Sequence, residues 1–433
     1  MESERRQQKP VARLGRTVIA LGVVSLFTDM SSEMAYTQVP LFLTGVLGVS
    51  VFYVGLIEGV AESAASLLRV VSGYWSDRSG LRKPLTLLGY TLGAVSKPLI
   101  ALATAWPFVL LMRFTDRFGK GLRTAPRDAL IAETTPTELR GRAFGLHRAM
   151  DTTGAVLGPL LGIGFLSLLI HTGYSGDQGH NLRLLFLFAG LPGLFAILTL
   201  LFFVKEPPAA SSTASGNAAV SEDSALQNAA SDTVTLQNSK RGVPNRVEFP
   251  HWRDLDPAYR RFLLITLLFN LGNFSDAFLI LRAQSLHFTP TEILWLYAAF
   301  NIVEAVLGYG AGILSDRVGR RPLIITGYGV FALVYAGFGL ASNKASIVAL
   351  FLLYGLYYTL TQGVQRAYAA DMADPKQRAT QIGAYHTVVG IALLPASVIA
   401  GLLFLLNPAL PFFVGAATAL ASVLLLSKSN HDK

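Results

Sequence analysis

The sequence predicts an all-α membrane protein in which twelve transmembrane helices form two pseudo-symmetric bundles of six. Hydrophobic residues make up 52% of the 433-residue chain and charged residues only 15%, whereas soluble proteins carry about 25% charged residues. Long apolar stretches alternate with short charged loops, and one charged phrase of the first half returns in the second. These three observations indicate a bilayer-embedded protein with an internal repeat.

Each predicted span is a stretch of predominantly apolar residues long enough to cross the bilayer, which takes about 20 residues. The first set of six comprises 17–46, 51–76, 83–104, 107–133, 139–170 and 183–204. The second set comprises 261–286, 291–315, 321–341, 345–371, 378–405 and 408–427.

The spans divide the chain into five parts. These are an N-terminal tail (1–16), a first bundle (17–204), a linker (205–260), a second bundle (261–427) and a C-terminal tail (428–433). The linker is rich in Ala, Ser and Asn and poor in large apolar residues, so it cannot bury enough surface to fold and is predicted to be largely disordered.

Basic residues concentrate in both tails, in the linker and in every second loop. By the positive-inside rule, both termini and the linker face the cytoplasm. We expect a multi-pass protein of a bacterial inner (plasma) membrane. The net charge of +9 suits anionic lipids; the basic residues form no continuous face, so no nucleic-acid partner is expected.

The repeated phrase is "SGYWSDRSGLRKP" (72–84) in the first half and "GAGILSDRVGRRP" (310–322) in the second. Asp77 and Asp316 are 239 residues apart, and the flanking glycines keep the same offset. Two related six-helix halves indicate a parallel repeat, an arrangement that places a substrate site near the midplane between the halves.

On these residues the chain resembles the major facilitator superfamily, and the resemblance covers essentially all of it. The family's loop signature has Gly, three residues, Asp, a basic residue, one residue, Gly and a basic pair. It is matched by Gly73, Asp77, Arg78, Gly80 and Arg82, with Leu81 departing from it, and again by Gly312, Asp316, Arg317, Gly319, Arg320 and Arg321. The resemblance implies a gating motif that latches the halves on the cytoplasmic side during alternating access.

A second motif lies in the fifth span and resembles the signature of antiporters in this superfamily. It consists of Gly145, Gly154, Gly158, Pro159 and Gly162, with Ile163 in place of the final glycine. Three of these glycines share one helix face, where they permit close packing of a neighbouring helix. Ordinary small-residue packing is the alternative explanation.

Ionisable residues within spans cost at least about 2.5–3.5 kcal/mol each to insert, so they are candidates for function. Burial away from water favours a protonated carboxyl, and a nearby arginine favours the ionised form. Asp29 and then Glu33 are the predicted proton carriers, coupled to Arg117 or Arg113. A static buried salt-bridge network is the alternative. Glu58 lies nearer the outer end of its span and is expected to be solvated.

The second half carries fewer charges and more polar and aromatic side chains within its spans. We expect it to contact the substrate. The candidate substrate-binding residues are Asn270, Asn273, Asp276, Tyr354, Gln362 and His386.

The predicted function is secondary active transport of a small organic molecule by alternating access, as proton-coupled efflux. Proton-coupled uptake of a sugar, an organic anion or another nutrient is the alternative, followed by a non-transporting sensor on the same fold. The predicted partners are the substrate, protons and the lipid bilayer, with the proton gradient as energy source, no cofactor and a functional monomer.

An enzyme is not predicted. The chain has no cysteine, which excludes disulfides and thiolate chemistry, and it lacks His-Glu-x-x-His and a phosphate-binding loop with its lysine. "GYSG" at 173–176 resembles a rhomboid-type nucleophile sequence, but it lies outside the predicted spans and we interpret it as a chance loop.

Overall fold

The computed structural model describes residues 15–136, 139–205, 255–373 and 378–428. The predicted linker therefore lies almost entirely outside the described residues. The helices of the first half are α1 (Arg16–Tyr36), α2 (Val39–Leu41), the π-helical η1 (Phe42–Val46), α3 (Val51–Ser79), α4 (Arg82–Ile100), α5 (Trp106–Glu133), α6 (Arg140–His171) and α7 (Gln178–Phe203). Those of the second half are α8 (Pro257–Gly272), α9 (Ala277–Ser285), α10 (Pro290–Val318), α11 (Arg320–Leu340), α12 (Lys344–Met372), α13 (Arg378–Leu406) and α14 (Leu410–Ser427).

The predicted all-α fold with two six-helix bundles is confirmed. Because α1, α2 and η1 follow one another as one span, and α8 and α9 as another, the helices make twelve long segments. Ten of these, within the described residues, are long and apolar enough to cross a membrane by composition. The remaining two are α4 and α5, and the sequence of α5 contains five charged residues between 113 and 123.

Helix boundaries follow from local capping. The side chain of Ser50 accepts a hydrogen bond from Phe52 N, and that of Asp256 accepts bonds from the first turn of α8. Side-chain oxygens at this position satisfy otherwise unpaired N–H groups. The Asp256 cap starts the seventh span at Pro257, four residues before the predicted start.

Two glycines of the repeated phrase have a conformational role. Gly80 ends α3 with φ +66° and Gly319 ends α10 with φ +93°. Side chains disfavour both conformations, whereas glycine adopts them readily. The repeated glycine therefore permits the sharp connection between consecutive helices in each half.

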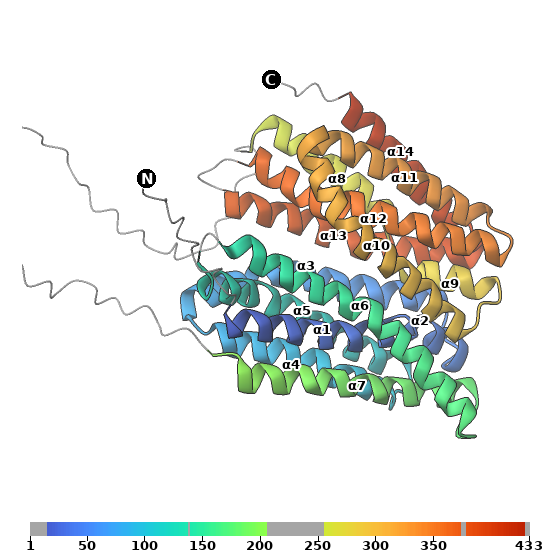
Figure 1. Ribbon diagram of the computed structural model, residues 1–433. Coiled ribbons are helices and arrows are strands. Elements are labelled where there is room, and N and C mark those ends of the chain that lie inside the picture. The colour runs from blue at the N-terminus through green and yellow to red at the C-terminus, as the bar shows by residue number, and fades with distance from the viewer. Residues whose placement is uncertain (1–14, 137–138, 206–254, 374–377, 429–433) are drawn as a thin grey trace, which may run out of the picture.

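The two halves form two layers of helices (Figure 1). They meet where α3 packs on α13 and α6 packs on α10, with smaller contacts between α2 and α9. We call the side where α7 ends and α8 begins the linker side. The side where η1 and α9 end is the far side.

Small residues bring α3 and α13 together. A Cβ at Gly55 would overlap the backbone oxygen of Ser397, and one at Gly59 would lie 3.0 Å from Leu394 Cα. The hydroxyl of Ser63 donates to Gly390 O at 2.7 Å, and that of Ser66 donates to His386 O at 2.9 Å. Such contacts are typical of helix packing in membranes.

Candidate functional site

A cavity of about 640 Å³ lies between the two halves. Its walls come from α1, α3, α5 and α6 in the first half and from α8, α10, α12 and α13 in the second. The lining extends from Tyr36 and Ser275 to Arg127, Arg148 and Arg366. Arg127, Arg148 and Arg366 each lie nearer the linker-side end of their helix. The cavity therefore extends from the middle of the bundle toward the linker side.

Contacts between the halves close the far end of the cavity. Gln38 donates to Pro290 O at 3.3 Å, and the Thr44 hydroxyl donates to Gln284 Oε1 at 3.1 Å. The hydroxyls of Tyr36 and Ser275 are 3.4 Å apart. Together with the α3–α13 contact, these bonds make the far side the closed side.

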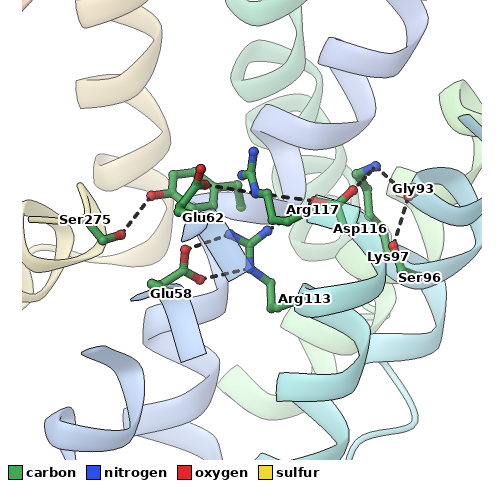
Figure 2. A network of polar contacts seen from close by, with 10 residues as sticks. Glu58, Glu62, Gly93, Ser96, Lys97, Arg113, Asp116, Arg117 and Ser275 are labelled. Atoms are coloured by element: carbon green, nitrogen blue, oxygen red, sulfur yellow. Dashed lines mark hydrogen bonds and ion pairs between the residues drawn. The ribbon is translucent and has the colours of Figure 1, made fainter. Parts of the chain in front are cut away.

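A buried ion-pair network joins α3, α4 and α5 (Figure 2). Arg113 donates from Nε and Nη2 to the two oxygens of Glu58, at 2.8 and 2.7 Å. The side chains of Glu58 and Arg113 are only 0% and 4% exposed. A bidentate pair of this kind is strong and fixes the geometry of both partners. The expectation that Glu58 would be solvated is wrong, because α5 covers it.

Asp116 is the centre of the same network. Its carboxylate lies 3.1 Å from Lys97 Nζ, 3.3 Å from Arg113 Nη1 and 3.7 Å from Arg117 Nε. Arg117 Nε is also 3.0 Å from Glu62. The network therefore balances three carboxylates with three cations, which is how buried charges are tolerated.

This pairing differs from the predicted one. Arg113 and Arg117 were expected to pair with Asp29 or Glu33 of the first span, but in this conformation they pair with carboxylates of α3 and with Asp116. Among the described residues no ion pair joins either arginine to Asp29 or Glu33. The arginines therefore belong to the network and Asp29 and Glu33 face the cavity.

Tyr36 connects this network to the second half. Its ring lies 4.9 Å from the guanidinium carbon of Arg113 and 5.3 Å from that of Arg117. Cations are attracted to aromatic faces at this range. Since its hydroxyl reaches Ser275, in the break between α8 and α9, Tyr36 contacts both halves at the closed end of the cavity.

Asp29 lies near Asp151 of α6, close enough for the two carboxyl groups to interact, and both line the cavity. Asp151 also accepts from the Ser25 hydroxyl at 2.7 Å and from Arg148 at 3.0 Å. Arg148 in turn donates to Glu304 of α10 at 2.6 Å, an ion pair that crosses between the halves. Two neighbouring carboxyl groups repel each other when both are ionised and can share a proton, so this cluster is suited to proton binding.

Five of the six predicted substrate-binding residues line the cavity: Asn270, Asn273, Asp276, Gln362 and His386. The sixth, Tyr354, is 2% exposed and lies behind the wall. Its hydroxyl donates to Asp276 at 2.6 Å, and Tyr358 donates to the other oxygen at 3.3 Å. Tyr354 therefore positions Asp276 from behind.

Three glycines of the predicted antiporter motif lie at helix contacts. A Cβ at Gly154 would overlap the backbone oxygen of Leu26, and one at Gly158 would lie 2.6 Å from that of Met30, so both pack α6 against α1. A Cβ at Gly162 would contact Met34 of α1 and, in the other half, Leu294 of α10. Among the described residues, a Cβ at Gly145 would meet nothing within 4 Å beyond its own stretch of helix.

The two copies of the predicted gating motif make equivalent contacts. Arg82 pairs with Glu133 and Arg320 with Asp371, each at 2.6 Å and each within its own half. A Cβ at Gly73 would lie 3.4 Å from the Cβ of Ala125, so this glycine lies against α5. The side chains of Asp77 and Asp316 lie outside what the structure describes, and the predicted latch between the halves stays a prediction.

Three cavity-lining arginines were missed from the sequence: Arg69 of α3, Arg127 of α5 and Arg366 of α12. All three lie toward the linker ends of their helices, where the positive-inside rule accounts for basic residues. A usable signal was present: each lies inside a predicted span rather than in a loop.

Comparisons with known proteins agree with this architecture. The sequence model of the Major Facilitator Superfamily matches residues 21–282 and 262–433. An uncharacterized MFS-type transporter of Methanocaldococcus jannaschii is 36% identical over 419 residues, covering 95% of this chain and 94% of its own length.

Two relatives with more specific names are more distant. Multidrug resistance protein 2 of Bacillus subtilis is 27% identical, covering 79% of this chain and 77% of its own. The major myo-inositol transporter of the same organism is 26% identical, covering 67% and 64%. Among solved structures, a bacterial homolog of the human lysosomal transporter Spinster, inward-facing and unoccupied, has a TM-score of 0.69 at 16% identity and covers 95% of this chain and 94% of its own.

Proposed function

Because the chain belongs to the Major Facilitator Superfamily, we propose that this membrane transport protein exports a small organic molecule in exchange for protons. The observation that carries the proposal is the cavity: both halves line it, it is closed at the far side, and unpaired as well as paired carboxylates face it. Alternating access requires a central site of this kind, open to one side at a time.

The proposed orientation places the linker side in the cytoplasm. The helix ends and turns of that side carry Arg78, Arg82, Lys83, Arg140, Arg142, Arg317, Arg320 and Arg321, whereas the far side carries mainly Arg183, Arg282 and Lys344. By the positive-inside rule, the conformation described is open to the cytoplasm. The protein would then lie in the cell membrane, ready to take up its substrate from inside.

The proposed proton site is the Asp29–Asp151 pair. Arg148 contacts Asp151 and also Glu304 across the halves. When the halves move, Arg148 cannot keep both contacts unchanged, and a change at Asp151 alters the preference of the pair for a proton. Proton release is thereby linked to the conformational change. Glu33, which also faces the cavity, is the second candidate carrier.

Export is favoured over uptake by the antiporter-like motif of α6 and by the similarity to a multidrug resistance protein. The opposing possibility is uptake by proton symport, which the similarity to a myo-inositol transporter supports.

Direction is tested first in cells. Cells producing the wild-type chain and cells producing the D29N variant are compared by mass spectrometry of small molecules inside and outside. Export predicts a compound that is depleted inside and enriched outside in the wild type alone. Enrichment inside the wild type would overturn export in favour of uptake.

Coupling is then tested with that compound in proteoliposomes containing a pH-sensitive dye. Exchange predicts that protons move in the direction opposite to the compound. The D29N variant is expected to lose the proton signal and still to bind the compound. Movement of both in one direction would contradict antiport, and an unchanged signal in D29N would remove Asp29 as carrier. A sensor would show neither signal.

A further inference from the structure

We propose that Arg69, Arg127 and Arg366 form a binding site for an anionic group, a carboxylate or a phosphate, and that the transported molecule is an organic anion. This inference rests on the proposed function and adds the substrate class.

All three arginines line the cavity and they come from both halves. Arg69 lies on α3, Arg127 on α5 and Arg366 on α12. Arg366 and Arg127 are the cations whose charges act most strongly on Arg69, and Arg69 and Arg366 both act on His386. The three guanidinium groups therefore concentrate positive charge at one place on the wall.

The nearby carboxylates already have partners. Glu62 pairs with Arg117 at 3.0 Å, and Asp128 pairs with Arg127 at 2.8 Å, so Arg69 and Arg366 are the two arginines of the site that an anion would pair with. Within the described part of the chain, no carboxylate lies within 4 Å of Arg69 or Arg366. Arg69 Nε is buried without a hydrogen-bond acceptor, and Arg366 Nε donates only to the carbonyl of Gln362 in its own helix, at 3.2 Å.

Buried donors without acceptors are costly, and like charges facing each other add to that cost. An anion between Arg69 and Arg366 would supply the acceptor that buried Arg69 Nε lacks, and guanidinium groups bind carboxylates and phosphates through paired hydrogen bonds. Since the arginines belong to different halves, the same anion would reduce the repulsion between α3 and α12 when the linker side closes.

Three of the cavity acids already have protein partners. Asp276 accepts from Tyr354 and Tyr358, Asp151 from Ser25 and Arg148, and Glu304 from Arg148. These three carboxylates are therefore less available to an organic cation. Glu33, which has no ion pair among the described residues, lies one helical turn from Tyr36 at the closed end of the cavity.

The position of the site along the cavity follows from helix geometry. Arg366 lies eight residues beyond Tyr358 on α12, which corresponds to about 12 Å along the axis. Tyr358 holds Asp276. An anion at the arginines would thus lie toward the linker side, well separated from the carboxylates at the closed end.

Binding of four small probes to the purified full-length chain tests the proposal. Benzoate, phenyl phosphate, benzyl alcohol and benzylammonium share one ring and differ in the charged group. Affinity is measured from the shift of the thermal unfolding temperature with probe concentration. We expect benzoate, phenyl phosphate or both to bind about tenfold or more tightly than benzyl alcohol, as one or two charge-assisted hydrogen bonds would give. The two anions distinguish a carboxylate site from a phosphate site.

Variants locate the site. R69Q and R366Q are each expected to weaken anion binding about tenfold, and R366K to weaken it less. R142Q, which removes a positive charge from the linker side outside the cavity lining, should bind as the wild type does. Arg366 is exposed, so the Arg366 variants carry the test even if R69Q does not fold.

The proposal is overturned if the anions bind no better than benzyl alcohol, if benzylammonium binds best, or if the R69Q/R366Q double variant keeps wild-type anion affinity. The measurement needs no membrane and no proton gradient. Failure of proton exchange would therefore leave the anion site standing, and a preference for the cation would overturn the anion site while leaving transport in place.

Discussion

At the scale of single residues, the fate of each charge depends on which helix covers it. Asp29 and Glu58 both interrupt apolar segments, and the sequence alone ranks the first as functional and the second as solvated. In the structure, Glu58 is fully buried against Arg113, while Asp29 faces the cavity beside Asp151. Residue type and spacing point to charges that are candidates for function, but the partner of each charge depends on packing between helices distant in sequence.

Replacing one member of the Glu58–Arg113 pair should destabilise the protein. In E58Q, Arg113 keeps only Asp116, itself shared with Lys97 and Arg117, as a carboxylate partner. Leaving a buried charge unpaired costs about 3–5 kcal/mol. We expect a clearly lower thermal unfolding temperature for E58Q and R113Q in detergent.

The matched double variant E58Q/R113Q should recover part of this loss, because it removes both charges. A double variant as unstable as the sum of the single changes would show that the two side chains act independently.

At the scale of helices, the spans were predictable and their interruptions were not. Apolar character and length located the long helices to within a few residues, since a bilayer imposes both, although α4 and α5 are less apolar than the other spans. The breaks after Tyr36 and after Gly272 leave no comparable pattern, because an apolar segment stays apolar whether or not it is continuous. Both breaks lie at the closed end of the cavity, where the far side must open during transport.

Two glycines of α6 can be used to test whether the motif serves close packing of α6 against α1. In G158V the new side chain would meet the backbone oxygen of Met30 at 2.6 Å or less, forcing α1 and α6 apart at a cost of about 1–3 kcal/mol. Because α1 carries Asp29, transport should fall together with thermal stability.

G145V is the matched control, since among the described residues no atom beyond its own stretch of helix lies within 4 Å of a Cβ at that position. It should leave stability unchanged. If G158V proved as stable and active as the wild type, close packing could not explain the motif. Loss of transport in a fully stable G145V would instead indicate that Gly145 is contacted in another conformation.

At the scale of the whole molecule, the two halves are joined tightly at the far side and more openly around the cavity. Tyr36 touches Ser275 while its ring covers Arg113 and Arg117. The ion-pair network therefore supports the closed end directly. The buried ion pairs are suited to holding the helices of the first half in fixed positions. The weaker hydrogen bonds between the halves are suited to a contact that must break during transport. The repeat and the fold class could be predicted from the sequence. The different roles of the ion pairs within the first half and of the hydrogen bonds between the halves depend on how the two halves assemble.

Locking the far side should stop transport. Thr44 and Gln284 meet across the halves, and the chain has no native cysteine, so a T44C/Q284C double variant can be bridged by a short bifunctional thiol reagent without other reactions. Alternating access requires this contact to separate, so transport of the compound found in the cell comparison should fall in proportion to the fraction bridged. The single variants T44C and Q284C, given the same reagent, should transport normally. Full activity in fully bridged protein would mean that the substrate leaves without opening between α2 and α9, and the exit would then have to lie along another contact of the halves.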